Sequence, residues 1–175
     1  MWHFCRTNLR LIIVTNEIAR LEALKDLAAL DTLPEIAFDD LVNFALERFK
    51  TPIAYISLVD ETRQWFKAQV GFSICETPRE QAFCSHTVQQ QQVLVVEDAS
   101  LDPRFQNSPL VTGPLNVRFY AGAPLIYKRQ SIGAFCIMDT TPRSFTAADK
   151  DDLVILAKAA VAELEMSRAR RFLLM

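Results

Sequence analysis

The spacing of hydrophobic residues changes from helical to extended and back again along the chain. Apolar side chains recur every three or four residues in the first 50 residues and again after Pro142, which predicts helices with one buried face near both ends. We expect Asn16 to cap the first helix and Thr146 to cap the last. In between, the apolar residues are mostly β-branched and aromatic, as in strands. The predicted strands are 53–59, 64–70, 93–96, 119–126 and 131–138.

The connections between these strands differ in length, and the longest is the most informative. Turns at 60–63 and 127–130 are short enough to join antiparallel strands as hairpins. Residues 72–79 are irregular, and a short helix is expected over 85–90. The stretch 99–117 is polar and holds three prolines, and a loop of that length in a compact domain is usually functional or mobile. The pattern predicts an α+β fold with helices on one face of an antiparallel sheet.

Composition and charge fit one globular domain and exclude several classes of function. The chain has 175 residues, of which 50% are hydrophobic and 23% charged, so it can bury a core of its own. Its net charge of −2 provides no positive field for a polyanion, and we expect no nucleic-acid partner. The four glycines stand too far apart for a phosphate-binding loop. His3 and His86 cannot form a zinc-binding H-E-x-x-H helix, and we assign no metal site.

The cysteines indicate a reducing environment. Cys5, Cys75, Cys84 and Cys136 include no C-x-x-C pair, and they are too few for a disulfide framework in a chain of this length. We therefore predict a cytoplasmic protein whose thiols are mostly buried.

Residues 1–15 raise the question of a targeting segment. Arg6 and Arg10 precede the apolar run 11–14, which is too short to span a bilayer and lacks a small-residue cleavage site. We interpret residues 1–15 as an N-terminal extension, either an upstream-extended start or a strand-like arm, in preference to a signal peptide. No other stretch approaches transmembrane length, so we expect no membrane partner.

Short motifs spread along the chain resemble, in their order, those of a GAF domain. The resemblance extends from about Asn16 to Arg168 and is closest to the sensor subtype found ahead of bacterial diguanylate cyclases and histidine kinases. The motifs are Leu30–Thr32, Ser57–Asp60, Gln64–Lys67, Glu76–Arg79, Phe83–His86, Val96–Ala99, Asp102–Phe105, Val111–Pro114, Arg118–Leu125 and Gly133–Asp139.

This resemblance implies a five- or six-stranded antiparallel sheet with the N- and C-terminal helices packed on one face. It also implies a small-molecule pocket under the loops on the other face and a homodimer formed through the terminal helices. We expect a regulatory sensor domain over residues 16–168 and a helix end or tail over 169–175. Because the chain stops at Met175, we expect either a fragment of a longer signalling protein or a sensor that acts on an output domain in trans. The resemblance names no ligand or cofactor.

Nine residues are the candidate ligand-binding positions. Arg104 and Arg118 each stand beside an aromatic residue, and an arginine fork with aromatic walls suits a small anionic or planar ligand. The alternative is structural: Arg104 would pair with Asp98 or Asp102 to close the loop, and Arg118 would hold the fold in the same way. The full set is Trp65, Phe83, Cys84, His86, Arg104, Phe105, Arg118, Tyr120 and Cys136.

Two pairs of neighbours among these positions leave alternatives open. Trp65 and Phe66 alternate across a strand, so only one of them can face the pocket while the other packs under the helices. Cys84 and His86 could form a thiolate–imidazole dyad on an extended backbone. A helix capped by Ser85 would instead bury Cys84 and leave His86 partly exposed, and we favour that helix.

A thiol enzyme is the main alternative to a sensor, although we favour a domain without catalytic activity. Cys75 and Cys84 could be laid on two loop cysteines of the free methionine-(R)-sulfoxide reductases, which are GAF enzymes. Their third cysteine, expected just before the fourth strand, is replaced here by Arg118-Phe119-Tyr120, and Cys136 is only a distant substitute. The patterns of bilin and cyclic-nucleotide sites in this family are not matched either. A ligand-free dimerisation module is the second alternative.

Overall fold

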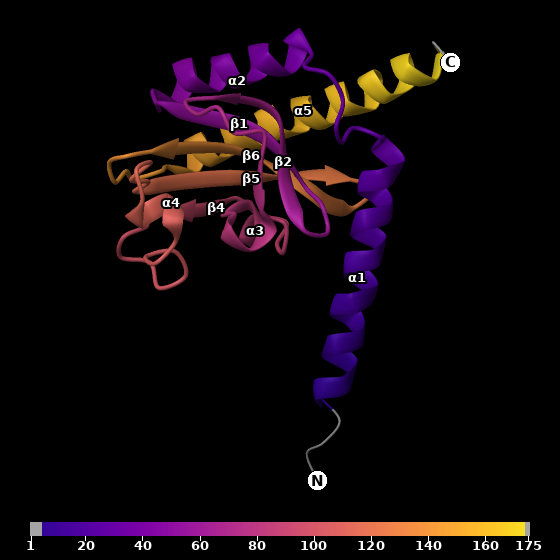
Figure 1. Ribbon diagram of the computed structural model, residues 1–175, viewed down its shortest axis with the longest axis horizontal. Coiled ribbons are helices and arrows are strands. Elements are labelled where there is room, and N and C mark those ends of the chain that lie inside the picture. The colour runs from indigo at the N-terminus through magenta and orange to yellow at the C-terminus, as the bar shows by residue number, and fades with distance from the viewer. Residues whose placement is uncertain (1–4, 174–175) are drawn as a thin grey trace.

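Six antiparallel strands form a single sheet whose spatial order is β3-β2-β1-β6-β5-β4 (Figure 1). The computed structural model describes the backbone of residues 5–173 and the side chains of residues 16–173. Both predicted hairpins are confirmed, and they meet through β1 and β6. The strands are β1 (Ile53–Val59), β2 (Arg63–Val70), β3 (Glu76–Pro78), β4 (Leu94–Val96), β5 (Phe119–Tyr127) and β6 (Gln130–Asp139).

The long helices supply the core on one face of the sheet, and the short helices supply the core on the other (Figure 1). We call these faces the helix side and the loop side. The helix side carries α1 (Cys5–Leu27), α2 (Ile36–Phe49) and α5 (Ala147–Leu173). The loop side carries α3 (Cys84–Thr87), which follows the 3₁₀ turn η1 (Arg79–Gln81), and α4 (Pro109–Thr112). The predicted α+β fold is confirmed, and the expected five- or six-stranded sheet has six strands.

The first helix begins earlier than the sequence indicated. It starts at Cys5, so Asn16 lies within the helix, and the prediction of an N-cap there is wrong. The described part of residues 1–15 is helical, which corrects the expected strand-like arm; residues 1–4 lie outside the described chain. A helical backbone from Cys5 onward needs no interruption at Asn16, because asparagine is tolerated inside helices at a cost of well under about 1 kcal/mol.

The last helix starts where it was predicted to start. Thr146 Oγ1 accepts the Asp149 N–H at 3.1 Å, and the Asp149 carboxylate accepts the Thr146 N–H at 3.0 Å, which is a reciprocal capping box. The helix continues past Arg168 and ends at Leu173, whose side chain is exposed. Leu174, which belongs to the helix end or tail expected over 169–175, lies outside the described residues.

The region between β2 and β4 contains more regular structure than predicted. Glu76–Pro78 forms the short strand β3 on the outer edge of β2. The helix expected over 85–90 is instead the single turn α3, with Phe83 in the N-cap position. The Ser85 hydroxyl donates to the Arg79 carbonyl rather than capping a helix, so the expected role of Ser85 is wrong.

Both faces of the central strands are buried, which explains why their sequences show no polar alternation. Every residue of β1 is buried. Ile56 and Leu58 face the helix side, in a core shared with Phe38 of α2 and Leu164 of α5. Tyr55 faces the loop side, in a second and separate core. A strand covered on both sides reads as a continuous apolar run rather than an alternating one.

A β-bulge in β2 changes which face its side chains reach. Ile56 pairs with Ala68 and Ser57 pairs with Phe66, so Lys67 is an extra residue on β2. Phe66 therefore belongs to the loop-side core, whereas Lys67 makes its contacts on the helix side. Adjacent residues of one strand thus reach opposite faces at a position where the ladder is locally broken.

A helix that crosses a bilayer must be long and mostly apolar, and the described helices do not meet this requirement. Within residues 5–173, none of them combines the length and apolar character needed to cross a membrane.

Candidate functional site

Five of the nine predicted ligand-binding residues pack against one another in the centre of the loop side. Phe83 stacks on Phe105 and on Tyr120, with ring centroids 4.3 Å and 4.9 Å apart. Cys84 and Cys136 lie in the same buried cluster. All five are buried, so the region where the sequence placed a pocket is filled by the protein's own side chains.

Trp65 does not join this group. Its side chain is part of the helix-side core, and Phe66 is the residue of that pair that reaches the loop side. The choice of Trp65 as a ligand-binding residue is therefore corrected. Neighbouring residues of a strand face opposite sides of the sheet, and Trp65 pairs with Leu58, which faces the helix side.

The two arginines hold the long loop in place. Arg104 donates from Nε and Nη2 to the Asp102 carboxylate at 3.0 and 2.6 Å, and its guanidinium lies 5.0 Å from the centre of the Phe105 ring. This hydrogen bonding lowers the pKa of Asp102. Arg118 Nη1 donates to the carbonyls of Val111 and Val117, at 3.1 and 3.0 Å. Both arginines therefore have the structural role that was considered as the alternative to ligand binding.

His86 lies at the margin of the same cluster. Its ring meets the Phe105 ring edge-on, with centroids 4.8 Å apart, and it is partly exposed. Burial, together with the charge of Arg104, lowers the pKa of His86. Cys84 begins a helical turn, as in the alternative that we favoured over a dyad: Cys84 is buried, His86 is partly exposed, and no hydrogen bond joins these two described side chains.

Cys84 instead sits in a cage of hydroxyl and thiol groups. Its Sγ is 3.3 Å from Cys136 Sγ, 3.3 Å from Ser57 Oγ, 3.5 Å from the Tyr55 hydroxyl and 3.6 Å from the Tyr120 hydroxyl. Burial raises the pKa of Cys84, but these hydrogen bonds outweigh it and lower the pKa to about 7. Burial and the neighbouring Cys84 raise the pKa of Cys136 well above its ordinary value. Cys84 and Cys136 are free thiols.

Cys75, the other candidate for thiol chemistry, is separate from this pair. It is exposed and lies between β2 and β3, where its carbonyl accepts the Phe66 N–H at 3.1 Å. The structure therefore joins Cys84 to Cys136, which the sequence had treated as a distant substitute, and not to Cys75.

A cleft lies beside the filled centre, toward the β2–β3 edge of the loop side. Tyr55, Phe66 and Met138 face it from three neighbouring strands, and Phe72 faces it from the segment after β2. The three aromatic rings meet edge to face, with centroids 5.3 Å (Tyr55–Phe66), 5.6 Å (Tyr55–Phe72) and 4.9 Å (Phe66–Phe72) apart. None of the nine predicted residues lines this cleft.

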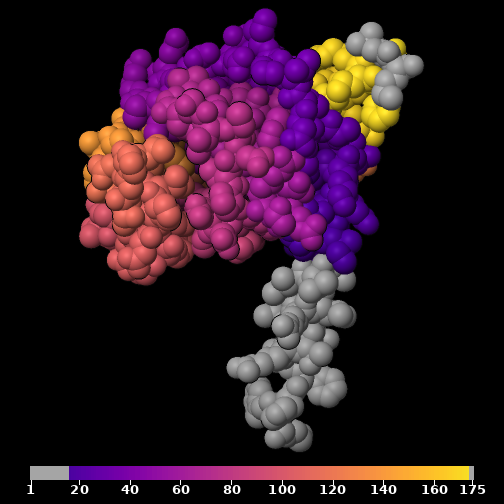
Figure 2. Space-filling model, in the orientation of Figure 1, coloured from indigo at the N-terminus to yellow at the C-terminus, as the bar shows by residue number. Residues whose placement is uncertain are grey.

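The walls of the cleft come from two segments that connect strands. Ile74 follows β2, and Leu110 and Leu115 belong to the long loop between β4 and β5. In Figure 2 the segment around residue 110 lies beside the segment around residue 75 on the face shown. The enclosed space is about 20 Å³, which is room for about one water molecule.

One end of the cleft is polar and unpaired. Gln64 Oε1 and Thr77 Oγ1, from directly paired positions of β2 and β3, are buried and have no hydrogen-bond partner. Only 3% of Gln64 is exposed. Two other buried atoms among the described side chains lack a partner, Gln69 Oε1 and Ser131 Oγ, and neither residue lines the cleft. A buried unpaired oxygen costs about 1–3 kcal/mol, so two at one place call for a partner.

Sequence reasoning missed this cleft because it did not predict β3. The pairing that brings Thr77 opposite Gln64 depends on a strand of only three residues. The one signal in the sequence is Gln64 itself, a polar residue inside a predicted strand beside two aromatic residues. A buried glutamine in such a place needs a hydrogen-bonding partner.

Two larger hollows are lined by none of the described residues that have a buried unpaired atom. A groove of about 280 Å³ lies against α5, where Val154, Ala157 and Val161 face Pro124 and Ile126 of β5. It is predominantly apolar and on the helix side, which suits helix packing more than specific recognition of a small molecule.

The other hollow, of about 550 Å³, is lined by charged groups that already have partners. Glu17 accepts hydrogen bonds from Arg20 and from Arg79, at 2.8 and 2.6 Å. Arg20 also donates to the Val59 carbonyl at 2.6 Å, which fastens α1 to the end of β1. Glu17 therefore serves both arginines, and the lining of this hollow has a net charge of one positive unit.

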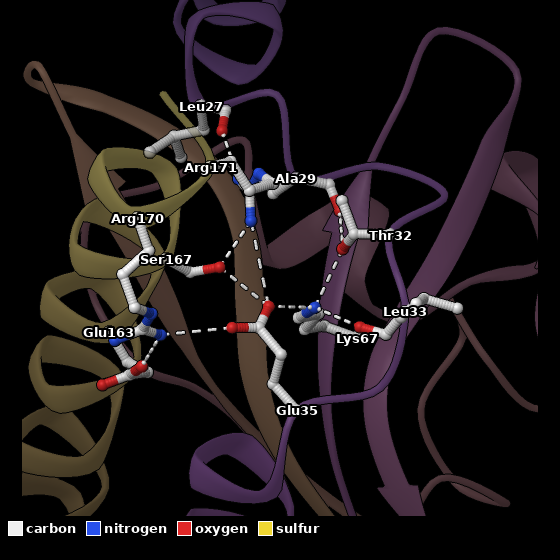
Figure 3. Close-up of polar contacts among 10 residues, drawn as sticks. All are labelled: Leu27, Ala29, Thr32, Leu33, Glu35, Lys67, Glu163, Ser167, Arg170 and Arg171. Carbon is white, nitrogen blue, oxygen red and sulfur yellow. Dashed lines mark hydrogen bonds and ion pairs between the residues drawn. The ribbon is translucent and has the colours of Figure 1, made fainter. Parts of the chain in front are cut away.

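A polar network on the helix side connects β2 to the C-terminal half of α5 (Figure 3). The buried Lys67 ammonium donates to Thr32 Oγ1 at 2.8 Å, to the Leu33 carbonyl at 2.9 Å and to Glu35 Oε1 at 2.7 Å. Its three donors are therefore satisfied.

Glu35 connects this network to α5. Its carboxylate accepts hydrogen bonds from Ser167 at 2.8 Å and from Arg170 at 3.2 Å (Figure 3). Arg171 adds a bond to the Leu27 carbonyl at 2.9 Å, at the end of α1. Burial raises the pKa of Glu35, but the hydrogen bonds from Lys67 and Ser167 outweigh it, and the pKa is lowered. β2, the α1–α2 connection and α5 thus share one half-buried carboxylate.

Comparison with known proteins identifies the fold. The family model for the GAF domain matches residues 33–164. A cyclic di-GMP phosphodiesterase of Pseudomonas aeruginosa is 35% identical over 161 residues. That match covers 90% of this chain but only 27% of the relative, so the chain spans about a quarter of that protein's length.

Solved structures agree on the fold. The GAF domain of a phosphoenolpyruvate-protein phosphotransferase from Coxiella burnetii has a TM-score of 0.67, with 18% identity over 89% of this chain and 96% of that one. A free methionine-R-sulfoxide reductase from Neisseria meningitidis has a TM-score of 0.65, with 18% identity over 86% and 91% of the two chains. At these identities the likeness concerns the fold alone.

Proposed function

This chain belongs to the GAF domain family, and from that premise we propose that it is a regulatory domain that senses a small molecule in the cleft beside β2 and β3. One observation carries the proposal: two buried oxygens, on Gln64 and Thr77, lack partners at the end of an aromatic cleft. Signalling relatives support a regulatory role, because the P. aeruginosa protein is a cyclic di-GMP phosphodiesterase.

The cleft can open without disturbing the sheet. Its walls, Ile74 on one side and Leu110 and Leu115 on the other, belong to connections outside the sheet, and their side chains are exposed or half-buried. A ligand larger than a water molecule would separate these walls and then order the loop around itself. Ordering of a loop by a ligand is a common way of shifting a protein between two arrangements.

The bulge in β2 provides a route from the cleft to α5. Phe66 lines the cleft, and the next residue, Lys67, binds Glu35, which in turn binds Ser167 of α5. A shift of β2 at Phe66 would therefore change the position of the Lys67 ammonium. We infer that occupancy of the cleft changes the packing of α5.

We further propose that the domain acts as a homodimer through its terminal helices. On the outer surface of α5, apolar residues recur at alternating intervals of four and three, the spacing of a coiled-coil seam. These residues are Ile155, Ala159, Ala162, Met166, Ala169 and Leu173, and all are exposed or half-buried. An output domain would lie in the same chain or in a partner, and the free thiols fit a cytoplasmic location.

A thermal-shift screen with cellular metabolites tests the proposed function. We expect at least one compound to raise the melting temperature of the wild-type protein, because binding to the native state alone adds stability. Leu115→Trp should abolish that shift by filling the cleft. Leu101→Trp is the matched control, since Leu101 lies in the same loop, is exposed and does not line the cleft. A shift that survives Leu115→Trp, or no shift with any compound, would refute the proposal.

A thiol enzyme is the second candidate, and the Cys84–Cys136 contact is the observation that favours it. A thiol with a pKa near 7 and a second thiol 3.3 Å away are the components of a nucleophile and a resolving partner. Their complete burial counts against it. Reduction of free methionine sulfoxide with a thiol donor, abolished in Cys84→Ser and retained in Cys75→Ser, would support the enzyme. Absence of turnover would eliminate it.

A further inference from the structure

We propose that the cleft takes a neutral, flat aromatic molecule that offers an N–H or O–H donor to Gln64 and Thr77. This inference rests on the proposed function and deepens it by naming the class of ligand. It depends on three features of the cleft: its lack of charge, its aromatic surfaces and the kind of polar atoms left unpaired at its end.

The cleft contains no charged group. Its polar residues are neutral, and the rest of its lining is apolar. Both cations of β2 are engaged elsewhere: Arg63 by Asp31 at 2.6 Å and by Glu76 at 2.5 Å, and Lys67 by Glu35 at 2.7 Å on the helix side. On the loop wall, Arg118 is engaged by two carbonyls. An anion in the cleft would lose its hydration without gaining a counter-charge, so phosphates and carboxylates are disfavoured.

The aromatic surfaces favour a flat guest. Phe66 and Phe72 contact each other at an interplanar angle of 70°, and Tyr55 meets both rings nearly at right angles. Rings in this arrangement present both edges and faces to a neighbour, and a further ring can join them edge to face or in an offset stack. The facing wall of Leu110 and Leu115 is apolar and adaptable.

The unpaired atoms require a donor. Gln64 Oε1 can only accept, and Thr77 Oγ1 can accept or donate. A guest whose edge carries an N–H or O–H would satisfy Gln64, and Thr77 could share that donor or pair with an acceptor beside it. A single water molecule would satisfy the same two atoms in the closed cleft, and a ligand of the proposed class would displace it.

Indole, indene and indole-3-carboxylate are the probes that separate these requirements. Indole has the ring and the N–H, indene has a ring of the same size without the N–H, and indole-3-carboxylate adds a negative charge. Isothermal titration should give indole a Kd about tenfold lower than that of either analogue, the factor expected when one buried acceptor is left unpaired or a charge is desolvated. Indene binding as tightly as indole, or the carboxylate binding more tightly, would overturn the proposal.

Matched variants locate the donor interaction. Gln64→Met removes the acceptor at nearly constant volume and should reduce the preference for indole over indene to less than about twofold. Thr77→Val, which retains the shape of the side chain, should reduce it partly. Gln69→Met is the control, because Gln69 also has an unpaired buried oxygen on β2 but does not line the cleft. A preference that persists in both Gln64→Met and Thr77→Val would overturn the proposal.

The ligand class and the proposed function can fail separately. If none of the three probes binds but a charged metabolite gives a thermal shift that Leu115→Trp abolishes, the ligand class is wrong and the sensor remains. If no compound of any charge gives such a shift, the sensor is refuted and the ligand class with it.

Discussion

At the scale of single residues, the side chain of Tyr120 explains why the centre of the loop side is filled. Its ring lies over Gly122, where a Cβ atom would stand only 2.1 Å from the tyrosine hydroxyl. This lets the hydroxyl reach Thr87 at 2.6 Å and Cys136 at 3.3 Å. The glycine therefore allows an aromatic side chain to fill the space that a ligand was expected to occupy.

A single carboxylate also makes the stability depend on pH. Hydrogen bonds from Arg20 and Arg79 lower the pKa of Glu17 to about 2, from an ordinary value of 4.5. A lowered pKa means that the stabilisation is complete above pH 4.5 and is lost as the pH falls toward 2. Because Glu17 is partly exposed, we expect Glu17→Gln to cost only about 1 kcal/mol at pH 7.

Urea unfolding of both proteins between pH 7 and pH 2.5 measures this dependence. The difference in unfolding free energy between wild type and Glu17→Gln should shrink below pH 4.5. A difference that stays constant down to pH 2.5 would contradict the assignment of the low pKa to Glu17.

At the scale of elements, how much the sequence predicts depends on what stabilises each element. β1, β5 and β6 are long and apolar, and their local pattern was sufficient to place them within one or two residues. β3 is three residues long and exists because β2 offers it a partner, so no local signal announces it. The cleft depends on β3, and for that reason its polar residues were missed although the correct face of the sheet was predicted.

The same reasoning applies to the predicted site residues. Position along a strand or loop was enough to gather Phe83, Cys84, Tyr120 and Cys136 into one cluster. It could not show whether these side chains enclose space or fill it, because that depends on how closely they pack. The bulge at Lys67 is equally invisible in the sequence, since it is defined by the register between two strands.

The helix-side network should contribute more to stability than surface ion pairs do. Glu35→Gln leaves the buried Lys67 ammonium without a counter-charge, which we expect to cost about 3 kcal/mol of unfolding free energy. Lys67→Met should cost less, because it removes the buried ammonium itself and so leaves no buried charge in need of a counter-charge. Asp152→Asn is the control: it breaks an exposed pair with Arg48 and should cost less than about 1 kcal/mol.

Equilibrium unfolding in urea compares the three variants. If Glu35→Gln is no more destabilising than Asp152→Asn, the network does not hold α5 to β2, and the proposed route from the cleft to α5 loses its basis.

At the scale of the whole molecule, the two sides of the sheet carry different features. The loop side holds the cleft, and the helix side holds α5 and its outer apolar stripe. α5 uses one stripe, which includes Leu156 and Leu164, to pack on the rest of the domain. The stripe through Ile155 and Met166 has no partner among the described residues, and both side chains are exposed. Large exposed apolar stripes of this kind mark interfaces.

The oligomeric state tests this interpretation. We expect a dimer in solution, and we expect Met166→Glu to weaken it about a hundredfold, because a charge would have to be buried in the seam. Leu101→Glu is the control, since Leu101 is at least as exposed but lies in the long loop. Sedimentation equilibrium of the three proteins measures the dissociation constants. A monomeric wild type, or equal weakening by both variants, would contradict a dimer through α5.

The central claim, that the cleft beside β2 and β3 receives a small molecule, is tested most directly through the methionine methyl groups. Met138 lines the cleft, so its methyl group reports on occupancy, whereas Met166 lies on the outer surface of α5 and reports on changes in that helix. With ¹³C-methyl methionine, a fractionated metabolite extract should shift the Met138 signal in at least one fraction, and Leu115→Trp should abolish that shift. A Met138 signal that no fraction moves would contradict the account.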